Sequence, residues 1–279
     1  DLLTRALLEI ICLKLVSRVD EIPGRFCPRL LRYHLQPDQE SREGLLSEVS
    51  TCLEELEKDR FVKVNDGLIT STPLGEAVAF SSLKIEEASV VFRALRHASS
   101  RILLSSDLHL LSLVTPVRHD IPVHLEAYLN LYNAMAPDQR AVADRCGISE
   151  GFLNSCARRN TLLSRSTPVP VCHRKSPEGA RAWQRQLVTH LRFYATLLLH
   201  HLLKGVPLPM LASTYKVNCG QIQQLQSTST AFCGMVVGFC DRLRWWALAA
   251  ALTPLSEQLS TGAPSFVAEM TSKLSHVGL

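Results

Sequence analysis

The sequence has no motif that would cradle a nucleotide, hold a zinc ion or cross a membrane. No GxxxxGK[ST] loop occurs among the 279 residues, so the backbone NH groups and the lysine that hold nucleotide phosphates are missing. No spacing of residues suggests Ser/His/Asp or Cys/His catalysis. No apolar run reaches the roughly 18 residues that a membrane helix needs. We therefore predict that the chain has no catalytic site, metal site or membrane span of its own.

Cysteines are present but show no grouping. The chain has nine, an odd number, and no two of them form a CxxC pair. A closed zinc site needs four grouped ligands and a disulfide framework needs paired cysteines, so neither is expected. Free cysteines in this number are typical of a reducing compartment, which here means the nucleus or the cytosol.

The composition is that of an ordinary globular protein. Hydrophobic residues make up 46% of the chain and charged residues 20%, which is enough apolar side chain for a core. The length suggests one or two domains. Because the chain begins with Asp1 rather than Met, we expect it to be a fragment or a processed product.

Positive charge is concentrated in one stretch. The whole chain has a formal net charge of +4. The stretch Arg158–Arg192 alone has eight arginines and lysines against the single Glu178, a net charge of +7, so the remainder carries −3. Such a stretch fits a phosphate-binding surface. It also fits a solvated loop followed by a helix with an arginine face, and charge alone does not separate the two interpretations.

Residues 1–72 have the element order of a winged helix. We expect helices over Leu2–Val19, near Cys27–Leu35 and over Glu43–Asp59, the last with apolar residues at helical spacing. Two short strands then flank Asn65-Asp66-Gly67, a sequence typical of a hairpin turn. Three helices followed by a hairpin predict a winged-helix domain.

The third helix of this domain is acidic. Its predicted exposed residues include Glu43, Glu48, Glu54, Glu55 and Glu57. Carboxylates repel DNA phosphates, and reading bases in the major groove requires a close approach to them. We therefore predict a structural or docking role for the domain, and not sequence-specific reading of duplex DNA.

Residues 73–279 read entirely as helices, joined by a Pro- and Ser-rich loop at Thr161–Pro177. The mainly α fold class is thus a winged helix with a short β-hairpin, followed by a multi-helix bundle. The predicted bundle helices are Ile85–Ser99, Asp107–Val114, Glu126–Met135, Asp138–Cys146, Ser149–Arg159, Glu178–Lys204, Pro209–Tyr215, Asn218–Leu243, Trp245–Leu259 and Pro264–Leu274.

The helix Asn218–Leu243 has the most unusual composition. Asn218 and Gln221 match a variant of the capping box. The following turns are rich in Gln, Ser and Thr, and no charged residue occurs before Asp241. The expected core stripe consists of Ile222, Leu225, Phe232, Val236, Phe239 and Leu243.

A second stripe on this helix consists of the small residues Ser227, Ala231, Gly234 and Gly238. Each glycine inside a helix costs about 1 kcal/mol relative to alanine, so a compensating role is expected. Another helix could pack closely there. Alternatively, an unpaired nucleic-acid strand could pass along the stripe, with Gln, Ser and Thr as uncharged hydrogen-bonding groups.

Four blocks of the sequence are distinctive: Leu74–Leu83 (LGEAVAFSSL), Ser106–Pro116 (SDLHLLSLVTP), Gly147–Leu153 (GISEGFL) and Cys219–Gln226 (CGQIQQLQ). With these blocks the chain resembles a known family, the helicase half of DNA polymerase theta and the polymerase-theta-like helicases of superfamily 2. The resemblance runs in order from about residue 45 to about residue 260.

The resemblance implies a ratchet helix. In this family two RecA-like motor domains precede a winged helix and a helical bundle, and one bundle helix lies along the translocated single strand. The resemblance places Asn218–Leu243 on that helix. The basic stretch, with Arg158, Arg159 and Arg192, would contact the same DNA. The ratchet-helix residues that it implies face the strand are Gln223, Gln224, Ser227, Thr228 and Ala231.

The sequence also departs from the family. Archaeal relatives have an arginine and a tryptophan where this chain has Gln224 and Ala231, so a charge and a base-stacking platform are absent. The segment Thr161–Ser176 differs, and the chain ends before a helix-hairpin-helix module would fit. No carboxylate set of a polymerase is found either.

The resemblance further implies a DNA-binding portion of an ATP-dependent repair helicase, located in the nucleus and acting in double-strand-break or crosslink repair. Single-stranded or forked DNA and upstream RecA-like motor domains would be its partners. ATP and magnesium would bind those motors, with no cofactor in this chain. A protein–protein adaptor without nucleic acid remains the main alternative, and a sequence-specific winged-helix regulator a third.

Overall fold

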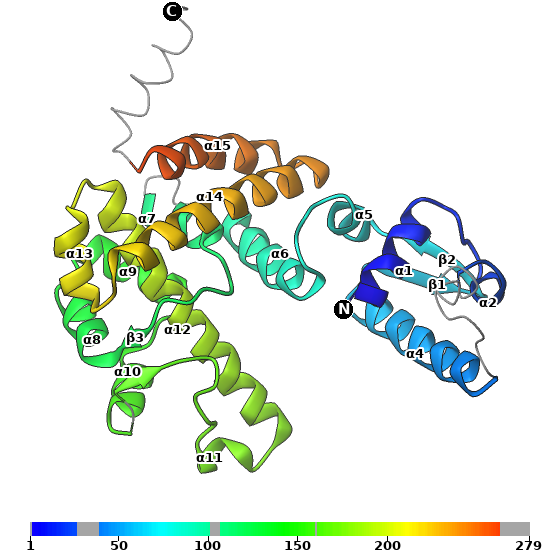
Figure 1. The fold of residues 1–279 in the computed structure, drawn as a ribbon, viewed down its shortest axis with the longest axis horizontal. Helices are drawn as coiled ribbons and strands as arrows, with labels where there is room; N and C mark the ends of the chain where they lie inside the picture. Colours follow the sequence, from blue (N-terminus) through cyan, green and yellow to red (C-terminus); the bar gives the residue numbers. More distant parts are fainter. Residues whose placement is uncertain (1, 27–38, 101–106, 160, 263–279) are drawn as a thin grey trace, which may run out of the picture. The chain divides into compact units, whose positions relative to one another are not determined.

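The computed structural model describes residues 2–26, 39–100, 107–159 and 161–262. Its contacts divide the chain into two compact units, residues 1–93 with 238–246, and residues 94–237 with 247–279. The mainly helical fold with a short hairpin is confirmed (Figure 1). The two compact units divide the chain at other residues, and the domain boundary predicted after residue 72 stays a prediction.

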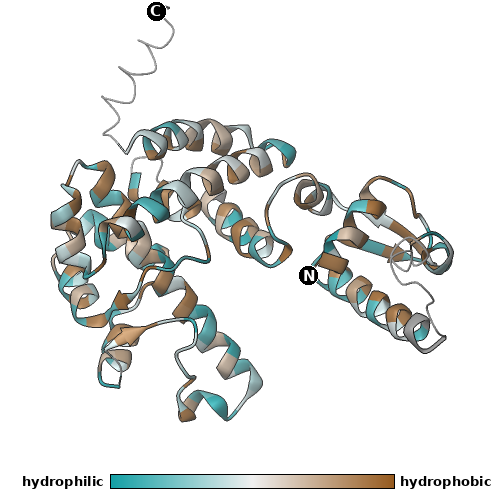
Figure 2. Ribbon diagram, viewed as in Figure 1, coloured by the Kyte–Doolittle hydropathy of each residue, from teal (hydrophilic) through white to brown (hydrophobic). Residues whose placement is uncertain are grey.

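The first unit is built on α1 (Leu2–Cys12), which packs against α4 (Gln39–Lys58). Apolar and hydrophilic residues alternate along α4 as the helix turns (Figure 2). The face with Val49, Cys52 and Leu56 is buried. Between these helices come the short η1 (Val19–Glu21) and α2 (Ile22–Arg25). The helix predicted near residues 27–35 lies outside the described residues, so the winged-helix assignment stays a prediction.

The predicted hairpin is present. Strand β1 (Val62–Asn65) pairs with β2 (Leu68–Ser71) in antiparallel register. Asp66 and Gly67 both have positive φ, 50° and 76°, which is the conformation of a tight two-residue hairpin turn. The periodicity and the turn residues together therefore predicted this element correctly.

The first helix is shorter than predicted. We expected it to run to Val19, but α1 ends at Cys12 and Lys14 has a φ of 56°. The chain then runs extended beside β2, where the Ile69 NH donates to the Ser17 carbonyl at 2.8 Å and Arg18 pairs with Leu68. Pairing with the hairpin therefore overrides the helical preference of this segment.

Helix α5 (Pro73–Ala79) follows the hairpin directly, and the Thr72 hydroxyl caps it by accepting from the Gly75 NH at 3.0 Å. A side chain at Gly75 would place its Cβ 2.0 Å from the Phe61 carbonyl oxygen, so only glycine fits there. Helix α6 (Ile85–Ser100) comes next in the chain. Arg5 of α1 donates to the Leu83 carbonyl at 2.7 Å, which fixes the segment between α5 and α6.

The second unit is a bundle around α12 (Pro177–Leu203), which packs against α7, α11 and α13. Eight consecutive residues of α12, Phe193–His200, are buried, so the helix is covered on every side there. Tyr194 packs between Tyr128 and Tyr215, tilted against the first ring and edge-on to the second, with ring centroids 5.1 Å apart in both pairs. The helices around it are α7 (Asp107–Val114), α8 (Leu125–Asn133), α9 (Pro137–Arg145), α10 (Glu150–Ala157), α11 (Val171–Arg174) and α13 (Leu208–Tyr215).

The prediction that residues 73–279 are entirely helical is wrong at one place. Strand β3 (Val123–His124) pairs with β4 (Leu162–Leu163), two residues each, in antiparallel register. Two-residue strands have no periodicity to detect. The loop predicted at Thr161–Pro177 accordingly contains β4 and the short α11.

Helix α14 (Cys219–Arg242) and helix α15 (Trp246–Thr261) end the described chain and run antiparallel, side by side (Figure 1). Hydrogen bonds join them, among them one from Gln226 Nε2 to the Leu259 carbonyl at 2.8 Å and one from Cys233 Sγ to the Leu252 carbonyl at 3.6 Å. The predicted helix Pro264–Leu274 lies outside the described residues.

Candidate nucleic-acid interface

The predicted strand-facing residues of α14 share one exposed face of the helix. Gln223, Gln224, Ser227, Thr228 and Ala231 are all exposed. The opposite side holds the predicted core stripe, of which five members are buried: Ile222, Leu225, Phe232, Val236 and Phe239. The sixth, Leu243, is half-buried and follows the last residue of the helix. We call the exposed side, residues 223, 224, 227, 228, 231, 234 and 238, the open face of α14.

The small residues of the open face are uncovered. Gly234 and Gly238 are exposed, and a Cβ added to either would meet no atom of the described chain within 4 Å. The interpretation that another helix packs closely on this stripe is therefore wrong for the part of the chain that the structure describes. The free-energy cost of two mid-helix glycines is not offset by packing there.

The glutamines of α14 divide into two pairs. Gln221 closes the predicted capping box, because its Oε1 accepts from the Asn218 NH at 3.0 Å and its NH donates back to Asn218 Oδ1 at 2.8 Å. Gln226 donates to a carbonyl of α15 at 2.8 Å. The side-chain amides of Gln223 and Gln224 make no hydrogen bond to any described residue. Only the second pair is therefore available to an external ligand.

The three predicted arginines, Arg158, Arg159 and Arg192, also differ in their exposure and bonding. Arg158 and Arg159 are exposed and follow the last turn of α10, where they line an open hollow together with Thr161 and Leu162. Cations are favourable at a helix C-terminus, and these two remain accessible to solvent there. Their position suits contact with an anionic partner.

Arg192, unlike Arg158 and Arg159, is half-buried and bonded within the bundle. Its Nε donates to the Thr115 carbonyl at 2.7 Å and its terminal nitrogen to the Leu113 carbonyl at 3.0 Å. These carbonyls lie at the C-terminal end of α7, where backbone acceptors lack helical partners. The guanidinium thus caps α7 from within the bundle, and the interface described below is built without it.

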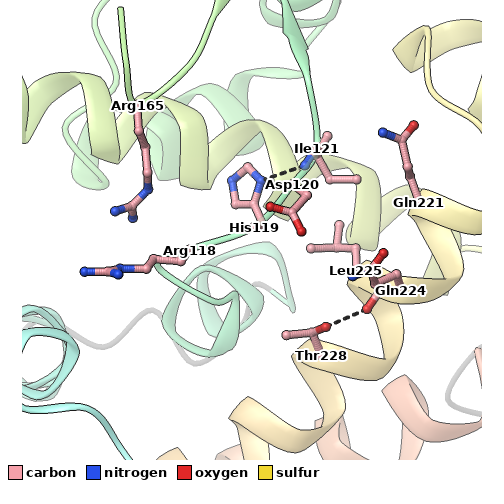
Figure 3. Close-up of a pocket in the computed structure, with 9 residues that line it drawn as sticks. All are labelled: Arg118, His119, Asp120, Ile121, Arg165, Gln221, Gln224, Leu225 and Thr228. Carbon is pink, nitrogen blue, oxygen red and sulfur yellow. Dashed lines mark hydrogen bonds between the residues drawn. The ribbon is translucent and has the colours of Figure 1, made fainter. Parts of the chain in front are cut away.

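A hollow of about 370 Å³ lies beside the open face of α14 (Figure 3). On the helix side, Gln224 and Thr228 line it together with Gln221 and Leu225. The other walls come from the loop between α7 and β3 and from the segment after β4. Their lining residues are Arg118, His119, Asp120, Ile121 and Arg165.

The loop between α7 and β3 is fixed from beneath by His119. Its Nε2 donates to the Leu191 carbonyl of α12 at 3.1 Å, and its Nδ1 accepts from the Ile121 NH at 3.3 Å. Burial, with the charges of Arg165 and Arg192 nearby, lowers the pKa of His119 to about 4, so the ring is neutral at pH 7 and keeps this tautomer. Arg165 reinforces the loop by donating to the Val117 carbonyl.

Sequence reasoning missed Arg118 and Asp120. Both are exposed and line the hollow, but Arg118 lies far from the basic stretch in the sequence. The only signal was a polar Arg-His-Asp triplet between Pro116 and Pro122, which reads as an ordinary loop. The pairing of β3 with β4 brings this loop and the start of the basic stretch into the same part of the bundle.

Other kinds of site receive no support in the described residues. No group of three or more His, Cys, Asp or Glu side chains there could hold a metal ion. The cysteines of the described chain are free thiols. None of the described helices is both long and apolar enough to cross a membrane.

Comparison with known proteins places the chain in a family. The profile of the family described as the DNA polymerase theta helicase-like region helical domain matches residues 86–259, more than half of the chain. The chain belongs to this family, and the resemblance read from the sequence is confirmed.

Three relatives illustrate the extent of the similarity. DNA polymerase theta of Mus musculus is 27% identical over 274 residues, 92% of this chain and 10% of that protein. DNA polymerase theta of Caenorhabditis elegans is 28% identical over 276 residues, 97% of this chain and 15% of that protein. The Helicase POLQ-like protein of Caenorhabditis elegans is 23% identical over 288 residues, 95% of this chain and 28% of that protein. The chain thus spans less than a third of the length of each.

Proposed function

We propose that this chain is the DNA-binding, non-motor portion of an ATP-dependent DNA-repair helicase, and that it guides single-stranded DNA along the open face of α14. In this proposal the RecA-like motor domains of a parent protein bind ATP and magnesium, and the site of action is the nucleus. Family membership supports the helicase context. The single observation that carries the DNA contact is the open face itself.

The open face suits a strand that moves. Gln223 and Gln224 have uncommitted amide groups, which both donate and accept hydrogen bonds. The face carries neither a charged nor an aromatic side chain, so it neither holds one phosphate strongly nor stacks one base. Contacts of this kind are weak and tolerant of sequence, which is what translocation of any DNA sequence requires.

The exposed arginines would add an electrostatic contribution to the proposed DNA binding. Arg158 and Arg159 are accessible at the end of α10, in the same compact unit as the N-terminal part of α14. For binding through such residues, log K is expected to fall linearly as the logarithm of the salt concentration rises. The acidic α4, with Glu43, Glu48 and Glu55 exposed, disfavours major-groove reading and thus the sequence-specific regulator.

The proposal is tested by titrating the 279-residue chain into a fluorescein-labelled oligo(dT) at 50 mM salt and following anisotropy. A variant with Gln224→Glu and Ser227→Glu places two carboxylates on the open face. We expect its affinity to fall about tenfold, or about 1.4 kcal/mol. The matched control, Thr253→Glu with Ser260→Glu, adds the same two negative charges at exposed positions of α15. It should bind oligo(dT) several-fold more tightly than the open-face variant.

The outcomes separate the three functions. No binding of oligo(dT) by the unaltered chain favours the protein–protein adaptor. Equal weakening by the two glutamate pairs means that net charge, and not the open face, controls binding. Preference for one duplex sequence favours the regulator. A separate variant, Arg158→Glu with Arg159→Glu, should weaken binding most at low salt.

A further inference from the structure

The corner between α14 and α15 carries an exposed tryptophan. The three tryptophans of the chain differ in burial: Trp183 is 4% exposed, Trp245 is half-buried and Trp246 is 62% exposed. The indole of Trp246 makes no hydrogen bond and no ring contact with any described residue. Tryptophan is highly buried on average in folded proteins and is enriched at interfaces, so an indole with this much open surface points to an external contact.

The backbone at the end of α14 fixes this corner. The Trp245 NH donates to the Cys240 carbonyl at 2.9 Å, and the Arg244 NH donates to the Asp241 carbonyl at 3.0 Å. These two bonds are the pair that defines a Schellman cap. Arg244 occupies the left-handed position of the cap, with a φ of 59°, where glycine is usual. The cap thereby sets the direction in which the chain enters α15, whose first residue is Trp246.

Contacts with the first unit anchor the residues that precede the exposed indole. The ring of Trp245 stacks on Phe92 of α6, with centroids 5.4 Å apart and 19° between the ring planes. The guanidinium of Arg242, the last residue of α14, lies over the ring of Phe80, 5.1 Å from its centroid. Both side chains are thus occupied within the protein, whereas Trp246 is not.

Arg244 carries a positive charge two residues before Trp246. Its side chain is exposed and makes no hydrogen bond or ion pair with any described residue. Asp241 is also exposed, so residues 241–246 have two arginines against one carboxylate and a net charge of +1. Proteins bind single-stranded nucleic acid with this combination, because an aromatic ring stacks on a base while a cation attracts the backbone.

The position of the corner favours a nucleic-acid strand as the occupant. It directly follows α14, whose open face ends at Gly238. At 1.5 Å per helical residue, Gly238 and Arg242 are about 6 Å apart along the helix axis, so a strand that passes along the open face would reach the corner next. Trp246 is also the only exposed large hydrophobic side chain of residues 211–262. A protein partner would usually bury a broader apolar patch.

We propose that Trp246 stacks on one base of the single strand that leaves the open face of α14, and that Arg244 contacts a backbone phosphate beside that base. This inference rests on the proposed function and adds the ring and the cation that the open face lacks. Every base has a flat π face, so a stacking contact accepts any sequence and suits a strand that moves.

The first test separates base contact from phosphate contact. Trp246→Ala should lower the affinity of the 279-residue chain for oligo(dT) about tenfold, as expected for the loss of one stacked base. The same variant should bind an oligonucleotide of abasic sites as tightly as the unaltered chain does, because that ligand has no base to stack. Trp246→Phe, which keeps an aromatic ring, should restore most of the affinity. The control Met210→Ala removes an apolar side chain of equal exposure, 62%, and should leave both affinities unchanged.

Tryptophan fluorescence reports the stacking itself. Trp183 is buried and Trp245 is stacked on Phe92, so the emission at the longest wavelengths comes from Trp246. Oligo(dT) should quench this emission in the unaltered chain and in Met210→Ala. A free nucleotide is the other source of a base. Equal quenching by thymidine monophosphate at the same nucleotide concentration would show a site for free nucleotides and would overturn the strand contact.

The role of Arg244 is tested by the salt dependence of oligo(dT) binding. Each phosphate contact adds about 0.7 to the magnitude of the slope of log K against log salt for a single strand. Arg244→Gly should reduce the slope by this amount without lowering the unfolding temperature, because glycine suits the left-handed cap position. Arg244→Lys should restore the slope, and Trp246→Ala should leave it unchanged. An unchanged slope in Arg244→Gly would overturn the phosphate contact.

The failure of this inference is distinguishable from that of the proposed function. Unchanged oligo(dT) affinity in Trp246→Ala, while glutamates on the open face still weaken binding, overturns the stacking site and leaves the α14 contact standing. If Trp246→Ala instead alters only the sedimentation of the free chain, the indole belongs to an interface between two copies, and the stacking site is overturned as well. Absence of oligo(dT) binding by the unaltered chain at 50 mM salt overturns the proposed function, and the stacking contact with it.

Discussion

The two longest helices of the bundle, α12 and α14, differ in what surrounds them. Helix α12 has 27 residues, and eight consecutive residues of its C-terminal half are buried, so that part of the helix is covered on all sides. Helix α14 has 24 residues and buries one side only, while its open face presents Gln, Ser, Thr, Ala and Gly to solvent. One helix therefore organises the core, and the other offers a long surface that nothing in the described chain covers.

The difference shows how to separate structural from functional polar residues in a helical protein. On α12 three of the polar side chains that face the bundle are engaged: Arg192 caps α7, Thr196 donates to Thr115 Oγ1 at 2.9 Å, and His190 Nε2 accepts from the Ser149 NH at 3.0 Å. On the open face of α14, Gln223 and Gln224 have uncommitted amides. Exposed polar groups that have no hydrogen-bond partner within the protein are better candidates for ligand contact than polar groups that are already bonded internally.

The largest contrast is expected for side-chain truncation. Leu198 on α12 is fully buried, and Leu198→Ala should lower the free energy of unfolding by about 2–5 kcal/mol through lost transfer energy and a residual cavity. Ser227→Ala on the open face should change it by less than about 0.5 kcal/mol. Urea unfolding followed by circular dichroism measures both, and similar losses would contradict the comparison.

The buried histidines of α12 predict acid sensitivity. Burial, with Lys204 and His201 nearby, lowers the pKa of His200 to about 4, below its unfolded value of about 6.5. The unfolded chain therefore binds more protons between these values, so stability falls as pH drops from 6.5 to 4, on the order of 3 kcal/mol for this residue. Its Nε2 is buried without a partner among the described residues.

His200→Leu should therefore unfold at a higher temperature than the unaltered chain at pH 5 and should show a smaller loss between pH 7 and pH 5. The exposed His173 provides the control, since His173→Gln should leave the pH profile unchanged. An undiminished pH dependence in His200→Leu would mean that other groups, and not His200, control acid unfolding.

Two arginines of α12 sharpen the comparison within one helix. Arg192→Ala should cost about 1–3 kcal/mol, because it leaves two carbonyls at the end of α7 without their charged donor. Arg185→Ala removes an exposed arginine from the same helix and should cost less than about 0.5 kcal/mol. Thermal unfolding of the two variants tests this, and equal stabilities would show that Arg192 has no capping role.

The smallest expected effect has the opposite sign. Gly234→Ala and Gly238→Ala add a Cβ that meets nothing in the described chain, so each should stabilise α14 by about 0.5–1 kcal/mol. Destabilisation by either substitution would reveal a covering group on the open face. Lower oligo(dT) affinity in these more stable variants would show that the glycines allow a close approach of the strand.

The fold could be predicted where local signals were strong. The apolar periodicity of α4, the Asp66-Gly67 turn and the capping box of Asn218 and Gln221 are all written in neighbouring residues, and the structure has each of them. The end of α1 and the pairing of β3 with β4 depend on contacts between distant segments. No local propensity reports such contacts.

The candidate site could be predicted in part. The capping-box pattern set Gln221 apart, and the family resemblance singled out Gln223 and Gln224, but the bond that engages Gln226 depends on the packing of α15, which the sequence does not report. The basic stretch likewise did not reveal that Arg192 caps α7. Whether the predicted residues bind DNA stays a prediction that direct measurement must decide.

Photo-crosslinking tests the open face most directly. With p-benzoylphenylalanine in place of Ser227, irradiation in the presence of labelled oligo(dT) should yield a covalent protein–DNA product. The same probe in place of Ser260, exposed on α15, should yield several-fold less. A strong product at both positions, or at neither while oligo(dT) still binds, would contradict a strand that runs along the open face of α14.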